Sequence, residues 1–178
     1  MSYFYYLRHG KTLWNNENKI CGCTDIGLSE EGKQQASIVA RTIMQDNIPI
    51  DLIYTSPLKR AYETSLIISK ATAIPVMCDQ RLREQSFGHY EGGSRSNKEF
   101  IHKRRQFADC FENGESLFKV TQRVYNFLDE LCDNREQVIL VVSHNAISRI
   151  VYSYFNSITN DTFFEYSVPN CELIRFDY

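Results

Sequence analysis

Two strand-like runs end on a histidine, and this pairing constrains the fold more than any other feature of the chain. The first run, Tyr3–Arg8, is aromatic and β-prone and is followed by His9 and Gly10. The second run, Val138–Ser143, is followed by His144. In an open α/β sheet, the carboxyl ends of parallel strands meet at one edge, where ligands bind. The sequence therefore predicts that the two histidines meet across one crevice.

The residues around the first histidine are typical of an anion site. Arg8 has a permanent planar charge that matches phosphate oxygens, and Gly10 lets the backbone approach a ligand closely. Arg60 lies in the first turn of a predicted helix, where the helix dipole also favours an anion. Taken alone, Arg8–Gly10 fits a surface turn after an edge strand better than an anion site. The phosphate-site prediction therefore depends on the rest of the chain.

The rest of the chain alternates between predicted helices and strands, which favours an α/β fold. Helices are expected over 30–45, from Pro57, within 94–114, over 115–134 and over 146–152, and further strands over 51–56, 74–78 and 172–176. Ser29 and Ser56 are the predicted N-caps of the first two helices. Apolar spacing predicts that Met44 and Leu66 face the core.

Composition narrows the function classes. A chain of 178 residues fits one domain, over 1–178, and a net charge of −2 argues against a nucleic-acid partner. The first residues lack the basic and apolar regions of a signal peptide, and no run is long enough to span a membrane, so a cytoplasmic location is expected. The six cysteines are scattered, and Cys21 and Cys23 have no companion pair, so no metal site is expected.

Six motifs together resemble the histidine phosphatase superfamily, in its phosphoglycerate-mutase-like branch. They occur in the family's order and cover about residues 3 to 176: Arg8-His9-Gly10, Leu28–Gly32 with Gln35-Ala36, Thr55–Ala61, Leu82–Glu84 with Phe87-Gly88 and Glu91-Gly92, Gly114–Ser116, and Ser143-His144. The resemblance implies a three-layer α/β/α sandwich on a mostly parallel sheet. It also implies a small helical cap, roughly residues 89–114.

The resemblance assigns roles to individual residues. It implies that His9 attacks phosphorus and becomes phosphorylated, and that Glu84 protonates the leaving oxygen and later activates water. The phosphate-binding residues that it implies are Arg8, Arg60, His144, Asn15 and Asn145. A histidine is substantially neutral at pH 7 and can offer a lone pair, provided that a hydrogen bond at its other nitrogen fixes the tautomer. Prepositioned cations can stabilise the transition state without a metal, so no cofactor is expected.

The expected activity is hydrolysis of a small phosphomonoester such as a sugar phosphate, a phosphoglycerate or α-ribazole phosphate. Mutases of the family are longer and enclose their substrate, whereas here the segment between Glu84 and His144 is short. Mutase-type phosphotransfer remains the alternative. Substrate selectivity is expected from Trp14, Tyr90, Lys103 and Arg104, if the cap lies over the pocket. A homodimer is possible, because exposed edge strands of such sheets often pair.

Two further hypotheses belong to other classes. A domain of this shape could bind a phosphorylated ligand without turning it over, although the presence of both His9 and Glu84 argues against a purely binding role. A metal-dependent hydrolase could use His9 and His144 as ligands, with Cys21 and Cys23 as the remaining candidates. That hypothesis predicts that a chelator abolishes activity.

Overall fold

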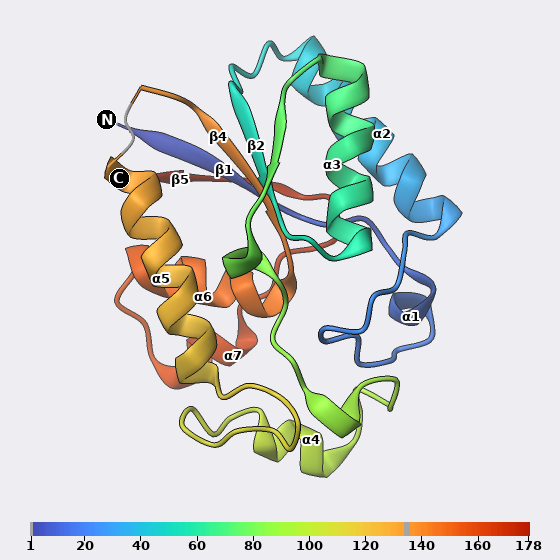
Figure 1. The fold of residues 1–178 in the computed structure, drawn as a ribbon, viewed down its shortest axis with the longest axis vertical. Coiled ribbons are helices and arrows are strands. Elements are labelled where there is room, and N and C mark those ends of the chain that lie inside the picture. The colour runs from blue at the N-terminus through green and yellow to red at the C-terminus, as the bar shows by residue number, and fades with distance from the viewer. Residues whose placement is uncertain (1, 134–135) are drawn as a thin grey trace.

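A five-stranded sheet forms the centre of the molecule (Figure 1). The structure is a computed structural model, and it describes residues 2–133 and 136–178. In spatial order β3-β2-β4-β1-β5, the strands are Val76–Cys78, Leu52–Thr55, Ile139–Ser143, Tyr3–Arg8 and Leu173–Asp177. Only β5 runs antiparallel to its neighbour, so the sheet is mostly parallel, as predicted.

Helices cover both faces of the sheet. Figure 1 shows α2 and α3 on one side and α5, α6 and α7 on the other. Their bounds are Glu30–Gln45, Lys59–Thr72, Leu117–Asp133, Asn145–Phe155 and Asn160–Glu165. Two short helices, α1 (Leu13–Asn16) and α4 (Lys98–Lys103), lie in the connecting segments, together with 3₁₀ turns at Gln80–Leu82 and Gly88–Tyr90. The arrangement confirms the predicted three-layer α/β/α sandwich.

The direction of the chain explains which helix covers which face. From β1 to β2 to β3 the chain moves toward one edge of the sheet, and from β3 to β4 it moves back. Parallel crossovers are almost always right-handed, so the reversal puts α2 and α3 on one face and α5 on the other. The connections after β1 and β4 therefore leave toward opposite faces. The gap between them is where α/β sheets bind ligands.

Alternation along the central strands builds two separate cores. In β1, Phe4 and Tyr6 pack toward α5 and α6, whereas Leu7 packs toward α2 and α3. In β4, Val141 packs toward α5 and α6, whereas Val142 packs toward α2 and α3, and both side chains are fully buried. A strand that is buried on both faces reads as a continuous apolar run, which is why the sequence of β4 predicts a strand so clearly.

The start of α3 differs from the prediction. The helix begins at Lys59 and its N-cap, Leu58, provides no side-chain hydrogen bond, so the predicted start at Pro57 with a Ser56 cap is wrong. The Ser56 hydroxyl instead hydrogen-bonds the His144 ring at 2.7 Å and accepts only a long 3.3 Å bond from the Leu58 N–H. The predicted Ser29 cap of α2 is confirmed by its bond from the Gly32 N–H.

Two side chains that were predicted to face the core are exposed. Met44 is 46% exposed because it lies at the rim of the apolar face of α2, and Leu66 is 44% exposed because it lies on the opposite side of α3 from the buried residues Ala61, Thr64 and Ile68. Fully buried Ile68 occupies the core position that Leu66 was expected to fill. The short helices α1 and α7 were not predicted, and the expected end of α5 near residue 134 lies outside the described residues.

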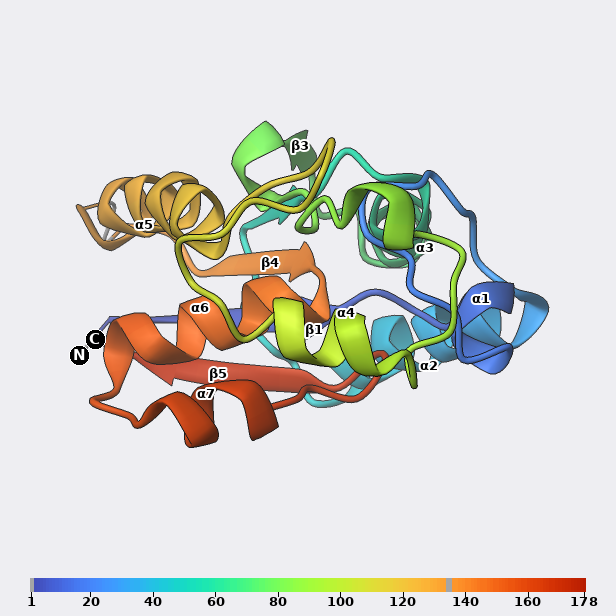
Figure 2. The same cartoon turned by 90° about the horizontal axis from the view of Figure 1, so that it is seen from below.

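The segment that contains α4 has an apolar cluster of its own. Tyr90, Phe100 and Phe111 are buried against one another, with Ile20 from the loop after α1 and the partly buried Phe87. Figure 2, which views the molecule from below, shows α4 in front of the central sheet and α6. This segment is the small helical cap that the sequence predicts after Glu84.

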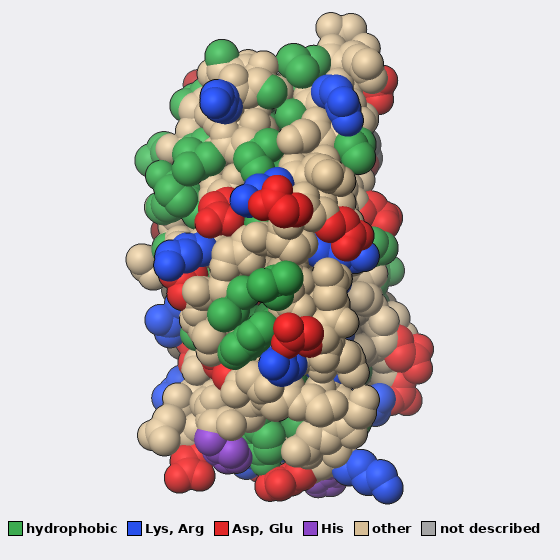
Figure 3. Space-filling model, turned by 90° about the vertical axis from the view of Figure 1, so that its right-hand side faces the viewer, with side chains coloured by type: hydrophobic (Ala, Val, Ile, Leu, Met, Phe, Trp, Pro, Cys, Tyr) green, Lys and Arg blue, Asp and Glu red, His purple; other side chains and the backbone are tan. Residues whose placement is uncertain are grey.

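The outer surface is mixed in charge. On the face seen in Figure 3, acidic and basic side chains are interspersed with hydrophobic and neutral ones. This mixture agrees with the net charge of −2 for the whole chain. Across the described residues, none of the helices combines the length and apolarity needed to cross a membrane.

Candidate active site

Two neighbouring strand ends bring the two histidines of the candidate site together. In the sheet, Arg8 of β1 is paired with Ser143 of β4, so the residues that follow them emerge side by side. The His9 N–H continues this ladder to the Ser143 carbonyl at 3.0 Å. The rings of His9 and His144 lie 5.1 Å apart between centroids. The two histidines therefore do meet, at the carboxyl ends of the adjacent parallel strands β1 and β4.

His9 is held as a neutral ring with its Nε2 lone pair free of a proton. Its Nδ1 lies 2.7 Å from the Gly10 carbonyl oxygen, which can only accept, so Nδ1 carries the hydrogen. Nε2 accepts a hydrogen bond from the Arg60 Nε–H at 3.2 Å. Burial, followed by the Arg60 and Arg8 charges, holds the pKa of His9 well below its ordinary value. The Gly10 carbonyl is the tautomer-fixing partner that the sequence could not reveal.

Gly10 is required for this geometry. A Cβ at this position would lie 2.5 Å from the Gly32 carbonyl oxygen at the start of α2, much closer than side-chain atoms approach backbone. The Gly10 N–H also donates to the Thr64 hydroxyl on α3 at 3.0 Å. The loop after β1 is therefore packed tightly between two helices, which holds the His9 ring in one orientation.

Arg60 is a fully buried guanidinium without a carboxylate partner among the described residues. Its Nη1 and Nη2 donate to the carbonyl oxygens of Thr24 and Gly22, at 3.0 and 2.7 Å. These carbonyls fix the orientation of the group without neutralising its charge. Burying a charge in this way is costly, and a bound anion would supply the missing counter-charge.

Glu91 orients the loop that holds Arg60. Its carboxylate accepts hydrogen bonds from the Cys23 N–H at 2.9 Å, from the Thr24 N–H at 2.7 Å and from the Thr24 hydroxyl. It also accepts from the Phe87 N–H at 2.9 Å, which ties the loop to the cap. The motif glutamate thus organises the backbone around the site, and does not line the pocket itself.

His144 supports the site from behind the pocket. It is fully buried as the N-cap of α6, and its Nε2 pairs with the Ser56 hydroxyl at 2.7 Å. Its Nδ1 is buried without a hydrogen-bond partner among the described residues. Burial and the charge of Arg60 hold the pKa of His144 well below its usual value. The ring is therefore neutral and retains one unused nitrogen beside His9.

Glu84 enters the pocket from the segment that follows β3. Its Oε1 accepts from the Gln85 N–H at 3.0 Å, and its Oε2 accepts from the Ala146 N–H at 3.3 Å, in the first turn of α6. The side chain is 8% exposed and lines the same pocket as His9. A carboxyl in this position can exchange a proton with a group bound beside His9.

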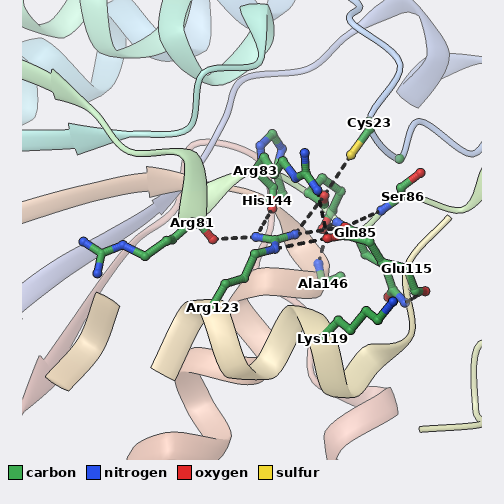
Figure 4. A network of polar contacts seen from close by, with 12 residues as sticks. Cys23, Arg81, Arg83, Gln85, Ser86, Glu115, Lys119, Arg123, His144 and Ala146 are labelled. Carbon is green, nitrogen blue, oxygen red and sulfur yellow. Dashed lines mark hydrogen bonds and ion pairs between the residues drawn. The ribbon is translucent and has the colours of Figure 1, made fainter. Parts of the chain in front are cut away.

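The backbone around Glu84 is clamped by Arg123 of α5 (Figure 4). Its Nη1 donates to the carbonyls of Arg81 and Arg83, the latter at 2.7 Å, and its Nη2 donates to the Glu84 carbonyl at 3.2 Å. The Arg123 charge is neutralised by Glu115, at 3.2 Å. One guanidinium therefore binds three backbone carbonyls, including the two that flank the Cα atom of Glu84.

The two asparagines present their amide NH2 groups to the pocket. The Asn15 Oδ1 accepts from the Thr12 N–H at 3.0 Å, which assigns the oxygen and leaves Nδ2 as the available donor. The Asn145 Oδ1 likewise accepts from the Val168 N–H at 3.1 Å. Arg8 also lines the pocket, with Nη1 bound to the Val168 carbonyl at 2.8 Å and a buried Nε that has no partner among the described residues.

The residues predicted to determine selectivity separate into two groups. Arg104 lines the pocket, but Trp14, Tyr90 and Lys103 are not among its lining residues. Tyr90 is buried in the aromatic cluster of the cap, and Lys103 forms an ion pair with Asp109 at 3.5 Å. The geometry therefore gives these three residues no contact with the pocket surface.

Two arginines of the pocket were missed in the sequence analysis. Arg149 lies on α6 four residues after Asn145, hence one turn further along the same face. That spacing was a usable signal. Arg95 reaches the pocket because its Nε donates to the Lys19 carbonyl at 2.9 Å. This contact joins segments that are far apart in sequence, and no local pattern indicates it.

Candidate metal ligands are not clustered in the described structure. Over residues 2–133 and 136–178, no group of three or more histidine, cysteine, aspartate or glutamate side chains is arranged to hold a metal ion. The Cys23 thiol donates to the Glu84 carbonyl at 3.1 Å, and burial raises its pKa to about 11. The Cys23 side chain thus holds the backbone of Glu84 at one more point.

Comparisons with known proteins agree with this geometry. A family model described as the histidine phosphatase superfamily (branch 1) matches residues 4–178. Phosphoserine phosphatase 1 of Hydrogenobacter thermophilus is 31% identical, covering 92% of this chain and 81% of its own length. The 2,3-bisphosphoglycerate-dependent phosphoglycerate mutase of Buchnera aphidicola is 30% identical, covering 97% and 91%. The structure of Entamoeba histolytica phosphoserine phosphatase in complex with 3-phosphoglyceric acid superposes with a TM-score of 0.84, at 29% identity, covering 99% and 91%.

Proposed function

The chain belongs to the histidine phosphatase superfamily, and we propose that it is a phosphomonoesterase that passes the phosphoryl group of a small metabolite through His9 to water. The observation that carries this proposal is the state of His9. Its Nδ1–H is bound to the Gly10 carbonyl, and its unprotonated Nε2 lies in a pocket that also holds Glu84. A neutral nucleophile beside guanidinium groups and a carboxyl group suits phosphoryl transfer.

In the first step, the Nε2 lone pair of His9 attacks phosphorus. A P–N bond forms and the P–O bond to the leaving group breaks, while Glu84 donates its proton to the departing oxygen. Arg8 and Arg60 balance the charge on the equatorial phosphoryl oxygens. Because Arg60 donates to Nε2 in the structure, a phosphoryl oxygen must replace Nε2 as the acceptor of that hydrogen bond.

In the second step, water attacks the phosphohistidine. Glu84, now a carboxylate, takes a proton from the water as its oxygen bonds to phosphorus, and the P–N bond breaks. Inorganic phosphate leaves, His9 returns to its neutral form and Glu84 is protonated again. Asn15, Asn145 and His144 complete the proposed phosphate-binding group. Every step uses side chains of this chain, so the proposal includes no cofactor.

The test is release of inorganic phosphate from a panel of phosphomonoesters in the presence of EDTA. We expect turnover by the wild type, none by His9→Ala, and a loss of about 10²-fold or more in Glu84→Gln with substrates whose leaving group needs a proton. Activity that disappears in EDTA and returns with a divalent metal would contradict the proposal. So would full activity in His9→Ala.

Phosphotransfer of the mutase type is the second candidate. It is favoured by the similarity to the Buchnera mutase, whose length this chain largely covers. The discriminating assay is interconversion of 2- and 3-phosphoglycerate with and without a bisphosphoglycerate primer. A mutase converts the isomers faster than it releases phosphate, whereas a phosphatase does the reverse.

A further inference from the structure

The proposed function needs His144 as a hydrogen-bond donor to a phosphoryl oxygen, and a neutral imidazole has only one N–H. His144 is neutral, because burial, followed by the charge of Arg60, holds its pKa well below the usual value. One ring nitrogen therefore carries hydrogen and the other carries a lone pair. Nε2 is already occupied by the Ser56 hydroxyl at 2.7 Å. His144 can thus donate to a phosphoryl oxygen only if Nδ1 carries the hydrogen.

Sheet pairing brings Ser56 to the His144 ring. Strands β2 and β4 are parallel neighbours, in which Thr55 is paired with Val142. The Ser56 N–H continues this ladder to the Val142 carbonyl at 3.0 Å. Ser56 follows β2 directly, and His144 follows β4 directly, so the two residues emerge side by side. Both side chains are fully buried. Their contact is therefore fixed by the sheet and shielded from solvent.

The backbone of His144 is held independently of its ring. Its carbonyl oxygen accepts a hydrogen bond from the Tyr6 hydroxyl at 2.6 Å and another from the Ser148 N–H at 2.9 Å. Tyr6 is itself fully buried on β1. These two bonds fix the backbone of His144 at the start of α6, but they do not touch either ring nitrogen. The position of the ring hydrogen therefore depends on the partners of Nε2 and Nδ1.

The hydrogen atoms around Ser56 can be satisfied in only one way. Its Oγ already accepts a long hydrogen bond from the Leu58 N–H at 3.3 Å. If His144 Nε2–H also donated to Oγ, the Ser56 hydroxyl hydrogen would be buried without an acceptor among the described residues. If the hydroxyl donates to the Nε2 lone pair, both atoms are paired. A buried hydrogen without an acceptor costs free energy, so the second arrangement is favoured.

This arrangement leaves the hydrogen of His144 on Nδ1. That nitrogen is buried and has no hydrogen-bond partner within the described structure. The rings of His144 and His9 lie 5.1 Å apart between centroids, and burial, followed by the charge of Arg60, lowers the pKa of both. The unpaired N–H therefore lies beside the proposed nucleophile and next to a cation. A phosphoryl oxygen bound there would supply the missing acceptor.

We propose that Ser56 is a positioning residue, which donates its hydroxyl hydrogen to His144 Nε2 and thereby keeps the Nδ1–H of that ring as a donor for a phosphoryl oxygen. Ser56 itself does not touch the substrate. It selects the tautomer of His144 by a donor at Nε2, whereas the Gly10 carbonyl selects that of His9 by an acceptor at Nδ1. The inference rests on the proposed function for the identity of the bound acceptor, but the tautomer belongs to the free protein.

Nitrogen NMR of the wild-type protein tests the tautomer without any variant. At about pH 7.5, the His144 ring should show hydrogen on Nδ1 and a lone pair on Nε2. Comparison with the spectrum of His9→Ala separates the signals of the two buried rings. Addition of inorganic phosphate should shift the Nδ1 signal of His144, because a phosphate oxygen then accepts its hydrogen. A wild-type ring with hydrogen on Nε2 would overturn the proposal.

Variants of Ser56 test whether its hydroxyl selects the tautomer. In Ser56→Ala, the Nε2 atom loses its donor, so a measurable share of the ring should carry hydrogen on Nε2. The Kd for inorganic phosphate, measured by calorimetry, should rise by about tenfold, as for the loss of one hydrogen bond to a charged group. Ser56→Thr retains the hydroxyl and should restore both the tautomer and most of the affinity.

Ser65→Ala is the matched control. Ser65 is also fully buried, but its hydroxyl donates to the Ala61 carbonyl at 3.0 Å and does not contact the His144 ring. This variant should leave the tautomer and the phosphate affinity unchanged. A Ser56→Ala protein with the wild-type tautomer and the wild-type Kd would overturn the proposal. So would equal losses in Ser56→Ala and Ser65→Ala, because they would indicate a general effect of removing a buried hydroxyl.

These measurements separate the inference from the proposed function. In an active phosphatase, Ser56→Ala should lower kcat/KM by about tenfold or more, because one preorganised donor to the phosphoryl group is lost. If the wild type releases no phosphate from any ester, the phosphatase proposal fails, and the NMR spectra and the phosphate Kd still decide the role of Ser56. If an active enzyme carries hydrogen on Nε2 of His144, the role of Ser56 is rejected and the phosphatase proposal stands.

Discussion

His9 combines two properties that the free amino acid lacks. The Gly10 carbonyl selects the tautomer, and burial with the Arg60 and Arg8 charges keeps the ring neutral. Both effects act in the same direction, because each favours an unprotonated Nε2. The same cations that suppress protonation of His9 would attract a phosphoryl group toward it. One arrangement of charges would therefore produce both the proposed nucleophile and its proposed anion site.

The protonation state of His9 gives a prediction at the scale of the residue. Because its pKa is lowered in the folded protein, the neutral form should persist as the pH falls through about 6.5, where an unperturbed imidazole gains its proton. Nitrogen NMR of the ring from about pH 7.5 to about pH 5.5 should show one neutral tautomer with hydrogen on Nδ1. The same protein in urea, where the imidazole is solvated, is the control.

A midpoint near the ordinary imidazole value in the folded protein would contradict this account of His9. So would a ring with its hydrogen on Nε2, because the lone pair would then point at the Gly10 carbonyl and away from the pocket.

At the scale of the element, the site depends on strand ends and on one short connecting segment. The strand ends are fixed by sheet pairing, which places His9 and His144 side by side. Glu84 has no such support, since it follows a 3₁₀ turn and lies outside any strand. Arg123 of α5 supplies the missing rigidity by binding the carbonyls of Arg81, Arg83 and Glu84.

Removal of the clamp should therefore affect catalysis more than binding. In Arg123→Met, three carbonyls lose their donor and the Glu84 carboxyl loses its fixed position, so we expect kcat to fall by about tenfold or more while KM changes little. The loss should be smaller for p-nitrophenyl phosphate, whose leaving group needs no proton from Glu84. Steady-state kinetics on both kinds of substrate measure the difference.

Arg81→Met is the matched control for the clamp. Arg81 lies nearby but faces outward, in ion pairs with Asp79 and Glu130. This variant should keep its kcat. If Arg123→Met loses activity equally on both kinds of substrate, or if Arg81→Met shows the same losses, Arg123 has only a general structural role. Arg123→Lys, which retains one charged donor, should recover part of the activity if positioning is the cause.

At the scale of the whole molecule, the sequence predicts the architecture well because the relevant signals are local. Strand β4 is a continuous apolar run, and Ser29 caps α2 as expected. Hydrogen bonds between segments that are far apart in the sequence leave no local pattern from which they could be predicted. The prediction of a Ser56 cap failed because His144, at the N-cap of α6, binds that hydroxyl, and no local pattern reveals the carbonyls that hold Arg60 or Arg95.

In the candidate site, too, residues marked by a local motif were predicted correctly, whereas contacts that depend on the fold were not. Motifs led to His9, Glu84 and Arg60, and all three line the pocket. The selectivity residues were chosen by composition, and Trp14, Tyr90 and Lys103 do not reach the pocket surface, whereas Arg104 does. A cap with its own aromatic cluster buries some of its side chains and directs others outward. Only the three-dimensional path of the cap decides which of them face the substrate.

The most direct test of the central claim is to trap phosphate on His9. The Glu84→Gln variant should accept the phosphoryl group from p-nitrophenyl phosphate, which needs no general acid, and should hydrolyse the phosphohistidine slowly because no carboxylate activates water. Mass spectrometry of peptides from a reaction quenched at alkaline pH should find one added HPO3 group on the peptide that contains His9. Phosphate on another residue, or an unmodified enzyme during continued release of p-nitrophenol, would contradict the account.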